Sequence, residues 1–249
     1  MTVHSRLVGS TAVVTIDRPE RRNALDGPTI AAIGAAFTAA EADDEVRAVI
    51  ITGAGDQAFC AGMDLKAPRG EPSTGPGLEV FTNRCYPKPV IAAVNGAAVG
   101  GGFEMALASD LVVVADHVTF AVPEVFRGLV GAGCTTRLAA RLPPAVVASL
   151  TLLGERIDAH RALALGLVNE VVPGPEVLDR ALAMAARLTE AAPLSLRITK
   201  ELIFKEQGMH DDAEWKAIRA LAGPAFASED AKEGAAAFAE KRPPVWTGR

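Results

Sequence analysis

The sequence predicts an α/β fold in which strands, glycine-containing turns and helices alternate before a largely helical C-terminal part. One observation is the stretch 90–110, VIAAVNGAAVGGGFEMALASD, in which an apolar run typical of a buried parallel strand leads through glycines into a helix of small residues. A second is the stretch 48–65, where another apolar strand precedes a glycine-containing loop, with Asp64 as a candidate helix start. The third is composition, because 249 residues with 49% hydrophobic content can form a large core. Such a chain should fold without disulfide staples.

The N-terminal half is expected to hold most of the strands. Strands 3–8 and 12–16 flank a Gly-Ser turn, which predicts a hairpin. Asp26 suits the N-cap of a helix at 28–42, because its side chain can accept from the free amides of the first turn, and Pro28 suits that turn. The further apolar runs predict strands at 48–52, 90–94, 111–115 and 119–121, with a helix at 103–108.

After residue 121 the pattern is mostly helical. Two consecutive prolines, Pro143 and Pro144, separate a helix at 131–141 from one at 145–153, since proline cannot continue a helix. Ser228 suits the N-cap of the last helix. The other elements expected are helices at 159–165, 175–190, 194–207, 212–221 and 229–241, and a short extended segment at 169–172.

The three glycines 100–102 lie where strand gives way to helix. Residues without Cβ allow positive φ and close approach of a ligand, and the amides and dipole of the following helix favour an anion there. Glu104 falls in the first turn of that helix, so an acid or base lies beside an oxyanion site, which suggests enolate chemistry. The alternative is a turn that serves close packing alone. A dinucleotide-binding turn fits poorly, because Met105 stands where its pattern needs glycine.

Composition excludes several classes of partner. Twenty-five basic and thirty acidic residues give a net charge of −5, and no long basic run occurs, so a nucleic-acid surface is not expected. Cys60, Cys85 and Cys134 are widely spaced and form no C-x-x-C pair, which suits reduced thiols in a cytoplasmic protein. The four histidines are scattered, so no metal site is expected. Neither a signal peptide nor a membrane-spanning run is indicated.

Three motifs occur in order, FCAGMDL, PVIAAVNGxAxGGGxE and FAVPEVxxGL, between an N-terminal RxNAL loop and a tail FAEKRPPVW. In sequence and spacing they resemble the enoyl-CoA hydratase/isomerase, or crotonase, family over nearly the whole chain. The resemblance implies a crotonase-like spiral of repeated β-β-α turns at 1–190. It further implies a C-terminal helical trimerisation region at 191–249, and assembly as homotrimers or as hexamers made of two trimers.

The resemblance also implies an active site. The two oxyanion donors fall on the backbone amides of Met63 and Gly101, and the two glutamates that similar hydratases use fall on Glu104 and Glu124. Family isomerases that only move a proton commonly keep one acidic group, usually the second. Hydration needs a carboxylate that activates water and an acid that protonates carbon, and the sequence offers both.

The expected activity is that of an enoyl-CoA hydratase, which adds water reversibly to a 2-enoyl-CoA to give a 3-hydroxyacyl-CoA. In this mechanism Glu104 activates the water and Glu124 protonates the α-carbon. Three alternatives remain open from the sequence. They are a double-bond isomerase that uses Glu124 alone, a carnitinyl-CoA dehydratase-like lyase, and a non-catalytic acyl-CoA-binding relative.

Coenzyme A is the carrier that the resemblance implies, as part of the substrate, and no metal or permanently bound cofactor is implied. Lys66 and Arg69 could add positive charge beside it. The positions matched to substrate or coenzyme A contacts are Arg22, Ala24, Leu25, Ala61, Gly62, Asp64, Leu65, Gly102, Pro123, Gly131, Phe238 and Lys241.

Two further expectations concern the segments around the site. Phe238 and Lys241 lie three apart on an expected helix, so they should share a face. The resemblance of the tail implies that this face approaches the coenzyme A of a neighbouring subunit, and the alternative is a terminal helix packed on its own subunit. The lid segment 66–88 is short and rich in proline and glycine, and should lack a long helix. Because this segment covers the acyl chain in the family, the preferred chain length is left open.

Overall fold

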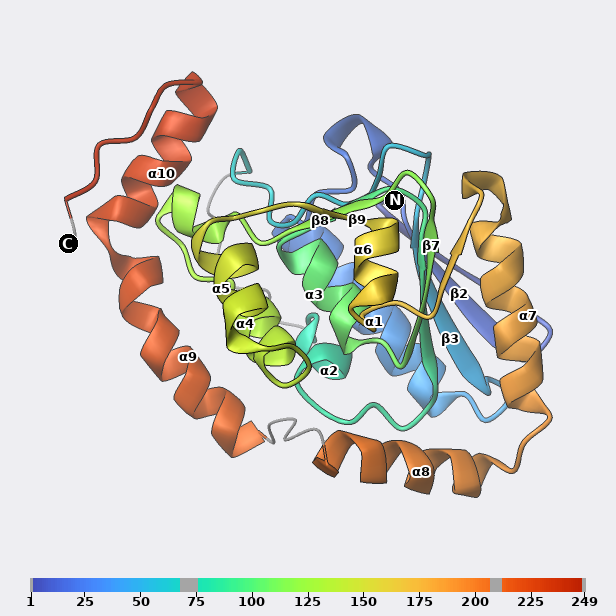
Figure 1. Cartoon of the computed structure of the whole chain (residues 1–249). Coiled ribbons are helices and arrows are strands. Elements are labelled where there is room, and N and C mark those ends of the chain that lie inside the picture. The colour runs from blue at the N-terminus through green and yellow to red at the C-terminus, as the bar shows by residue number, and fades with distance from the viewer. Residues whose placement is uncertain (1, 68–75, 207–211, 248–249) are drawn as a thin grey trace.

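The architecture consists of two sheets and a set of helices, seen in a computed structural model that describes residues 2–67, 76–206 and 212–247 (Figure 1). The larger sheet has six strands in the order β1-β2-β3-β5-β7-β10, and β1 alone runs antiparallel to its neighbour. Its strands are β1 Val3–Val8, β2 Thr11–Ile16, β3 Ala48–Gly53, β5 Val90–Val94, β7 Leu111–Ala115 and β10 Glu170–Val172. The expected α/β fold and the N-terminal hairpin are confirmed.

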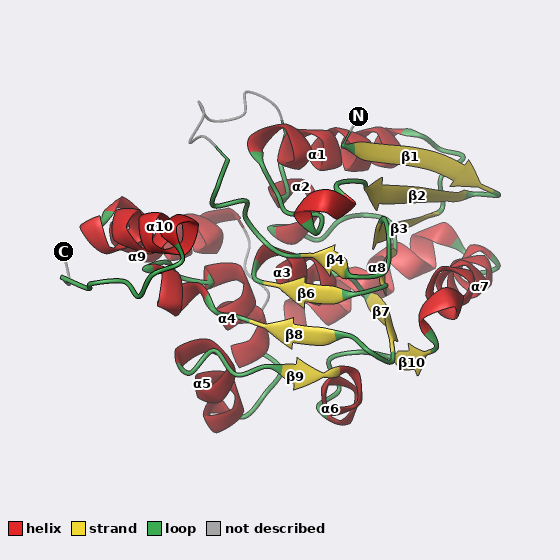
Figure 2. Cartoon of the chain, turned by 90° about the horizontal axis from the view of Figure 1, so that it is seen from above, coloured by secondary structure: helices red, strands yellow, loops and turns green. Residues whose placement is uncertain are grey.

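The second sheet contains four short strands that lie side by side in Figure 2. They are β4 Ala58–Cys60, β6 Ala97–Val99, β8 Thr119–Ala121 and β9 Ile157–Asp158. Of these, β4 and β6 fall in segments that the sequence analysis read as loops, and β9 falls in a segment to which it assigned no element. Strands of two or three residues are too short to show a hydrophobic period, and pairing with their neighbours defines them.

Successive turns of the chain contribute one strand to each sheet. β3 in the large sheet is followed by β4 in the small one, β5 by β6, and β7 by β8. The first two of these turns continue into helices α2 and α3. This repetition is the spiral of β-β-α turns that the family resemblance implied.

The helices fall close to the expected positions. The caps are confirmed, since the side chain of Asp26 accepts from the amide of Thr29 at 2.9 Å and that of Ser228 from the amide of Ala231 at 3.0 Å. The α-helices are α1 Gly27–Ala42, α2 Glu79–Thr82, α3 Gly101–Ala108, α4 Ala132–Ala139, α5 Pro144–Leu152, α6 Ala159–Ala164, α7 Val177–Thr189, α8 Pro193–Glu206, α9 Asp212–Ala227 and α10 Glu229–Glu240. Three short 3₁₀ helices are η1 Pro19–Arg21, η2 Glu124–Arg127 and η3 Gly174–Glu176.

The core lies around the large sheet. Helix α7 packs on β3, β5 and β7 from one side, and α1 and α3 lie on the other (Figure 1). Every residue of β3 and β5 is buried as a result, which explains their unbroken apolar sequences.

Three expectations about local structure are wrong. Asp64 starts no helix, because the following residues form a turn, in which its Oδ1 accepts from the amide of Lys66 at 3.1 Å while its Oδ2 lies 3.3 Å from Nη2 of Arg18. Helix α9 continues past the expected end at 221 and contains Pro224. The preceding residue is Gly223, whose missing Cβ removes part of the clash by which proline opposes a helix before it. Gly101 and Gly102 belong to α3, where the analysis had placed them in the preceding loop.

The C-terminal helices extend along the outside of the molecule. Helix α8 runs along the bottom of Figure 1, and α9 and α10 rise along its left side. Among the described residues, no helix is both long and apolar enough to cross a membrane. In the described part of the lid segment, the sole α-helix is α2, Glu79–Thr82. The remainder, with Arg69, lies outside the described residues.

Candidate active site

Gly100 joins strand β6 to helix α3 and organises the site. Its amide donates to the carbonyl of Ala121 at 3.0 Å, and its carbonyl accepts from the amide of Glu104 at 2.9 Å and from Cys134 Sγ at 3.2 Å. The residue has φ 54°, and a Cβ there would lie 2.6 Å from Oε1 of Glu124. Both the left-handed backbone and the close carboxylate require glycine at this position.

Two backbone amides are available beside this junction. Gly101 is the first residue of α3, so its amide has no acceptor within the helix. Met63 forms a parallel bridge with Leu25, in which the bonds run from Leu25 N to Gly62 O at 2.8 Å and from Asp64 N to Leu25 O at 2.9 Å. This pattern uses the residues on either side of Met63, so its own amide points away from Leu25.

Gly62 brings these two amides together. It has φ +85°, and a Cβ on it would lie 3.5 Å from the amide nitrogen of Gly101. A Cβ on Gly101 would in turn lie 4.0 Å from the Cα of Gly62. Two amides presented from touching loops can donate to one developing oxyanion.

The two glutamates come from different turns of the chain and meet at residues 131–133. Glu104 projects from the first turn of α3, and a Cβ on Gly133 would lie 1.9 Å from its Oε1. Glu124 begins η2, and a Cβ on Gly131 would lie 3.1 Å from its Cδ. Glycine at both positions leaves space for two carboxyl groups against one short segment.

The environments of the two carboxyl groups differ. Burial raises the pKa of Glu124 to about 7, and the nearby charge of Glu104 acts in the same direction. Within the described part of the chain, Glu124 Oε2 is buried without a hydrogen-bond partner. Burial also raises the pKa of Glu104, but the guanidinium of Arg137 opposes that shift. The pair can therefore hold one proton near neutral pH, with Glu124 as its carrier.

Arg137 on α4 is a site residue that sequence reasoning missed, and Cys134 lies on the same helix. Arg137 is 1% exposed, its Nη1 lies 3.6 Å from Oε1 of Glu104, and the same nitrogen donates to the carbonyl of Gly133 at 3.0 Å. The sequence signal was an arginine within an otherwise small and apolar helix, but periodicity cannot separate a buried arginine from a solvated one. Burial and the two carboxylates raise the pKa of the Cys134 thiol, so it stays neutral.

Most of the matched coenzyme A positions lie on two neighbouring loops, 22–25 and 61–65. The amide of Ala61 donates to the carbonyl of Arg22 at 3.1 Å, in addition to the Leu25 bridge. Arg18, to which the sequence analysis assigned no role, ties the loops together. Its Nη2 lies 2.9 Å from Asp26 Oδ2 and 3.3 Å from Asp64 Oδ2, and its Nη1 donates to the carbonyl of Ala24.

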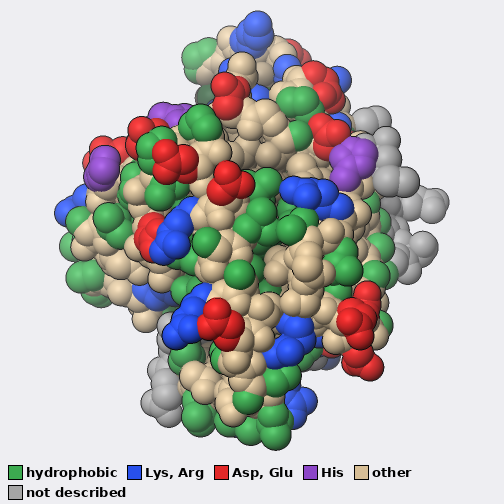
Figure 3. Space-filling view, turned by 90° about the vertical axis from the view of Figure 1, so that its right-hand side faces the viewer, with side chains coloured by type: hydrophobic (Ala, Val, Ile, Leu, Met, Phe, Trp, Pro, Cys, Tyr) green, Lys and Arg blue, Asp and Glu red, His purple; other side chains and the backbone are tan. Residues whose placement is uncertain are grey.

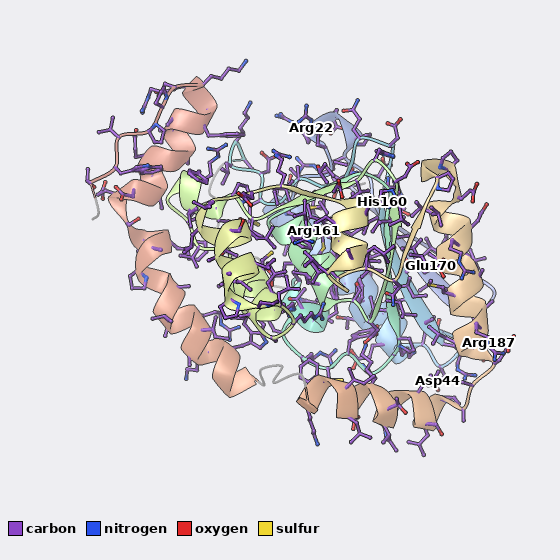
Figure 4. The ribbon with its side chains drawn as sticks, in the orientation of Figure 1. Arg22, Asp44, His160, Arg161, Glu170 and Arg187 are labelled. Atoms are coloured by element: carbon purple, nitrogen blue, oxygen red, sulfur yellow. The ribbon has the colours of Figure 1, made fainter. Side chains whose placement is uncertain are left out.

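Some of the matched positions are buried in the protein, and others lie at its surface. Leu25 and Gly102 are buried and serve packing, since a Cβ on Gly102 would lie 2.2 Å from the carbonyl oxygen of Cys60. Leu65 is half-buried, and Pro123 directly precedes Glu124. Arg22 is exposed and lies at the upper edge of the molecule in Figure 4. Surface positions such as this one are open to a ligand.

Phe238, near the C-terminus, lies beside η2 and Lys66 of its own chain. The ring centroid of Phe238 lies 4.8 Å from Cζ of Arg127 and 6.0 Å from Nζ of Lys66. The expectation that Lys241 shares a helix face with Phe238 is wrong, because α10 ends at Glu240 and Lys241 caps it with φ 56°. Both residues still line one cavity of about 240 Å³, together with Arg127 and Arg242.

On the face shown in Figure 3, basic and acidic side chains are interspersed, and neither kind forms a broad area. Across residues 2–67, 76–206 and 212–247, no group of three or more His, Cys, Asp and Glu side chains could hold a metal ion. The cysteines at 60, 85 and 134 are free.

Comparisons with known proteins agree over the full length. A family model described as enoyl-CoA hydratase/isomerase matches residues 7–249. The chain is 42% identical to a carnitinyl-CoA dehydratase of Escherichia coli strain K12, covering 100% of this chain and 99% of that protein. Among solved structures, a carnitinyl-CoA hydratase from Mycobacterium avium is 44% identical with a TM-score of 0.90, covering 100% of this chain and 99% of that one. An enoyl-CoA hydratase from Mycobacterium tuberculosis H37Rv is 42% identical with a TM-score of 0.78 and the same coverage.

Proposed function

Since this chain belongs to the enoyl-CoA hydratase/isomerase family, we propose that it adds water reversibly to a 2-enoyl-CoA thioester and forms a 3-hydroxyacyl-CoA. The observation that carries this proposal is the meeting of Glu104 and Glu124 at residues 131–133, beside the available amides of Met63 and Gly101. Proton transfer at one carbon alone needs one acidic group, whereas water addition uses two.

The thioester oxygen accepts from the amides of Met63 and Gly101. These donors withdraw electron density from the conjugated system, so the β-carbon becomes electrophilic. As negative charge develops on the oxygen, the same two hydrogen bonds stabilise the enolate. Coenzyme A lies along loops 22–25 and 61–65, which Arg18 holds together.

The carboxyl groups supply the elements of water. Glu104, as carboxylate, takes a proton from the water whose oxygen bonds to the β-carbon. Glu124, as carboxylic acid, gives its proton to the α-carbon. The product gains one water, and the pair still holds one proton in total, now on Glu104. Transfer of that proton back to Glu124 restores the enzyme, and dehydration follows the same steps in reverse.

The shared proton predicts a bell-shaped pH dependence of kcat/KM for hydration, and dehydration must show the same profile because the equilibrium constant does not change with pH. The two reactive states differ in which glutamate holds the proton, but both states hold one proton, so their ratio does not change with pH. Because the pKa of Glu124 is raised to about 7, kcat/KM should fall about tenfold per pH unit well above that value, as the pair loses its proton. Below the acid limb both carboxyls are protonated, and the rate falls again. Initial rates of hydration from pH 4 to pH 10 check this, and a kcat/KM that stayed level or rose well above pH 7 would contradict it.

The acyl group is proposed from the relatives. Two of those compared are named for carnitinyl-CoA, so the 2-enoyl thioester formed by removing water from carnitinyl-CoA is the first substrate to test, beside crotonyl-CoA. Ultraviolet absorbance separates the candidate activities. A hydratase removes the conjugated 2-enoyl chromophore, an isomerase creates it from a 3-enoyl thioester, and a protein that only binds does neither. Creation of the chromophore without its removal would overturn the proposal.

The assembly is also part of the proposal. Residues 191–249 form a trimerisation region, the protein is a cytoplasmic trimer or hexamer, and Phe238 and Lys241 complete the coenzyme A site of a neighbouring subunit. Their position on a cavity beside Lys66 and Arg127 supports a role at the coenzyme A end of the substrate.

Lys241→Ala is expected to raise KM for coenzyme A thioesters severalfold with little change in kcat, the pattern of lost uniform binding. Lys232→Ala is a matched control on α10, the helix that Lys241 caps, since Lys232 is exposed and pairs with Glu229. Pantetheine thioesters lack the nucleotide, so their KM should not change in either variant. An equal rise in KM for both kinds of thioester would argue against the contact.

A further inference from the structure

Arg137 is tied to the segment against which the Glu104 carboxylate packs. It lies four residues after Gly133 on α4, and its Nη1 donates to the Gly133 carbonyl at 3.0 Å. The same nitrogen lies 3.6 Å from Oε1 of Glu104, and Gly133 is the residue whose Cβ would overlap that carboxylate. One helical turn therefore sets the position of the guanidinium relative to the carboxylate.

The other sides of this guanidinium are held by packing. Its Cζ lies 4.8 Å from the ring centroid of Trp215, which belongs to helix α9. Within the described residues, Arg137 Nε and Nη2 are buried without hydrogen-bond partners. Such an arrangement disfavours folding, because buried polar groups are normally satisfied. Its presence beside Glu104 points to a task other than folding.

Arg137 borders a cavity of about 240 Å³ together with Arg141, Lys200 and Asp110. Lys200 is paired with Asp110 at 2.6 Å, so it is neutralised within the same cavity.

The charged surroundings of the two glutamates are unequal. The titratable groups that face Glu104 are Arg137 and Cys134 on α4 and Glu124 on η2. In the part of the chain that the structure describes, Arg137 is the cation that acts on Glu104, and none acts on Glu124. Two carboxyls that share one proton place it on the group with the less favourable ionised form.

Given the proposed function, we propose that Arg137 is a positioning residue that keeps Glu104 ionised and thereby directs the shared proton to Glu124. The enzyme then begins hydration with a base facing the water and an acid facing the α-carbon. Arg137 touches neither substrate nor water in this scheme and acts through Glu104. Trp215 supports it by holding the guanidinium plane from α9.

The test reads the ionisation of Glu104 directly. In a Glu124→Gln background, the infrared carbonyl band of protonated Glu104 is isolated as the difference from the Glu104→Gln/Glu124→Gln double variant and followed with pH. Adding Arg137→Met should raise the pKa of Glu104 by about one to three pH units, because a cation within 6 Å is lost. Arg137→Lys keeps the charge and should give a smaller rise. An unchanged pKa in the Met variant would overturn the proposal.

Two controls test whether a change in the pKa of Glu104 comes from the position of the Arg137 charge, from loss of any nearby cation, or from misfolding. Arg141→Met removes another cation from the same cavity, but Arg141 donates to the Leu107 carbonyl at 2.7 Å and should leave Glu104 unchanged. If Arg137→Met fails to fold by circular dichroism, Arg137→Gln replaces it, since glutamine can still donate to Gly133 but carries no charge. It should give the same rise in pKa, and its failure to do so would equally overturn the proposal.

This readout is independent of turnover. If the chain proved not to be a hydratase, the infrared titration could still show that Arg137 controls Glu104. If the pKa of Glu104 did not change when Arg137 was replaced, the hydratase activity could still be measured, so the proposed function would still be tested separately. In the active enzyme, Arg137→Met should also move the acid limb of kcat/KM to higher pH, which a purely structural defect would not do.

Discussion

Glu104→Gln is expected to lower kcat for hydration of a 2-enoyl-CoA by about 10²–10⁴-fold while thioester binding persists. Glutamine has nearly the size of glutamate and its hydrogen-bonding reach, but it cannot accept a proton from water. The amides of Met63 and Gly101 are backbone groups and are unchanged in this variant, so the oxyanion contacts should survive. Stopped-flow absorbance gives kcat, and calorimetric titration with a substrate analogue gives the dissociation constant.

Glu124→Gln should impair hydration to a similar degree but differs in a second measurement. Glu124 is the group proposed to meet the α-carbon, so its loss should abolish exchange of the α-proton of a saturated acyl-CoA with deuterated solvent. Glu104→Gln should retain more of this exchange, which nuclear magnetic resonance follows directly. Near wild-type hydration by either folded variant would reject the two-glutamate mechanism and favour the isomerase or the binding protein.

Gly101→Pro tests the oxyanion contact through the backbone. Proline has no amide hydrogen, and position 101 is the first residue of α3, where a helix tolerates proline. Losing one such donor typically costs on the order of 3 kcal/mol of transition-state stabilisation, so kcat should fall about 10²–10³-fold. The matched control is Gly101→Ala, which adds a Cβ 3.3 Å from Leu25 Cδ1 but keeps the amide.

The two variants should bind free coenzyme A equally, since that ligand has no thioester oxygen. Calorimetry of coenzyme A binding therefore monitors the integrity of loops 22–25 and 61–65 apart from catalysis. A kcat for Gly101→Pro within about threefold of that for Gly101→Ala would contradict the proposed role. The amide of Gly101 would then contribute far less to kcat than an oxyanion donor typically does.

Local chemistry made much of this fold predictable. Strand β5 carries an uninterrupted apolar sequence because both faces of its sheet are covered, and α1 carries the Asp26 cap that its first amides need. Glu104 could be singled out for a related reason, since its position after three glycines and in a first helical turn is visible in the sequence itself. Glu124 was identified by the family motif, because no local feature distinguishes it from a solvated carboxylate.

Tertiary structure decided what depends on contacts between distant segments. The short strands β4, β6 and β9 are defined by pairing with neighbouring strands. Helix α10 ends at Glu240, because Lys241 adopts a left-handed backbone conformation. The two carboxyls meet because β6 and β8 pair in parallel, which brings the turn after each strand to one edge of the sheet. Arg137 gained its place in the site by burial against Glu104 and Trp215. The sequence by itself thus determined most of the elements and the candidate site residues, whereas packing determined which of these residues lie together and how burial and neighbouring charges shift their ionisation, since only the folded chain brings those charges together.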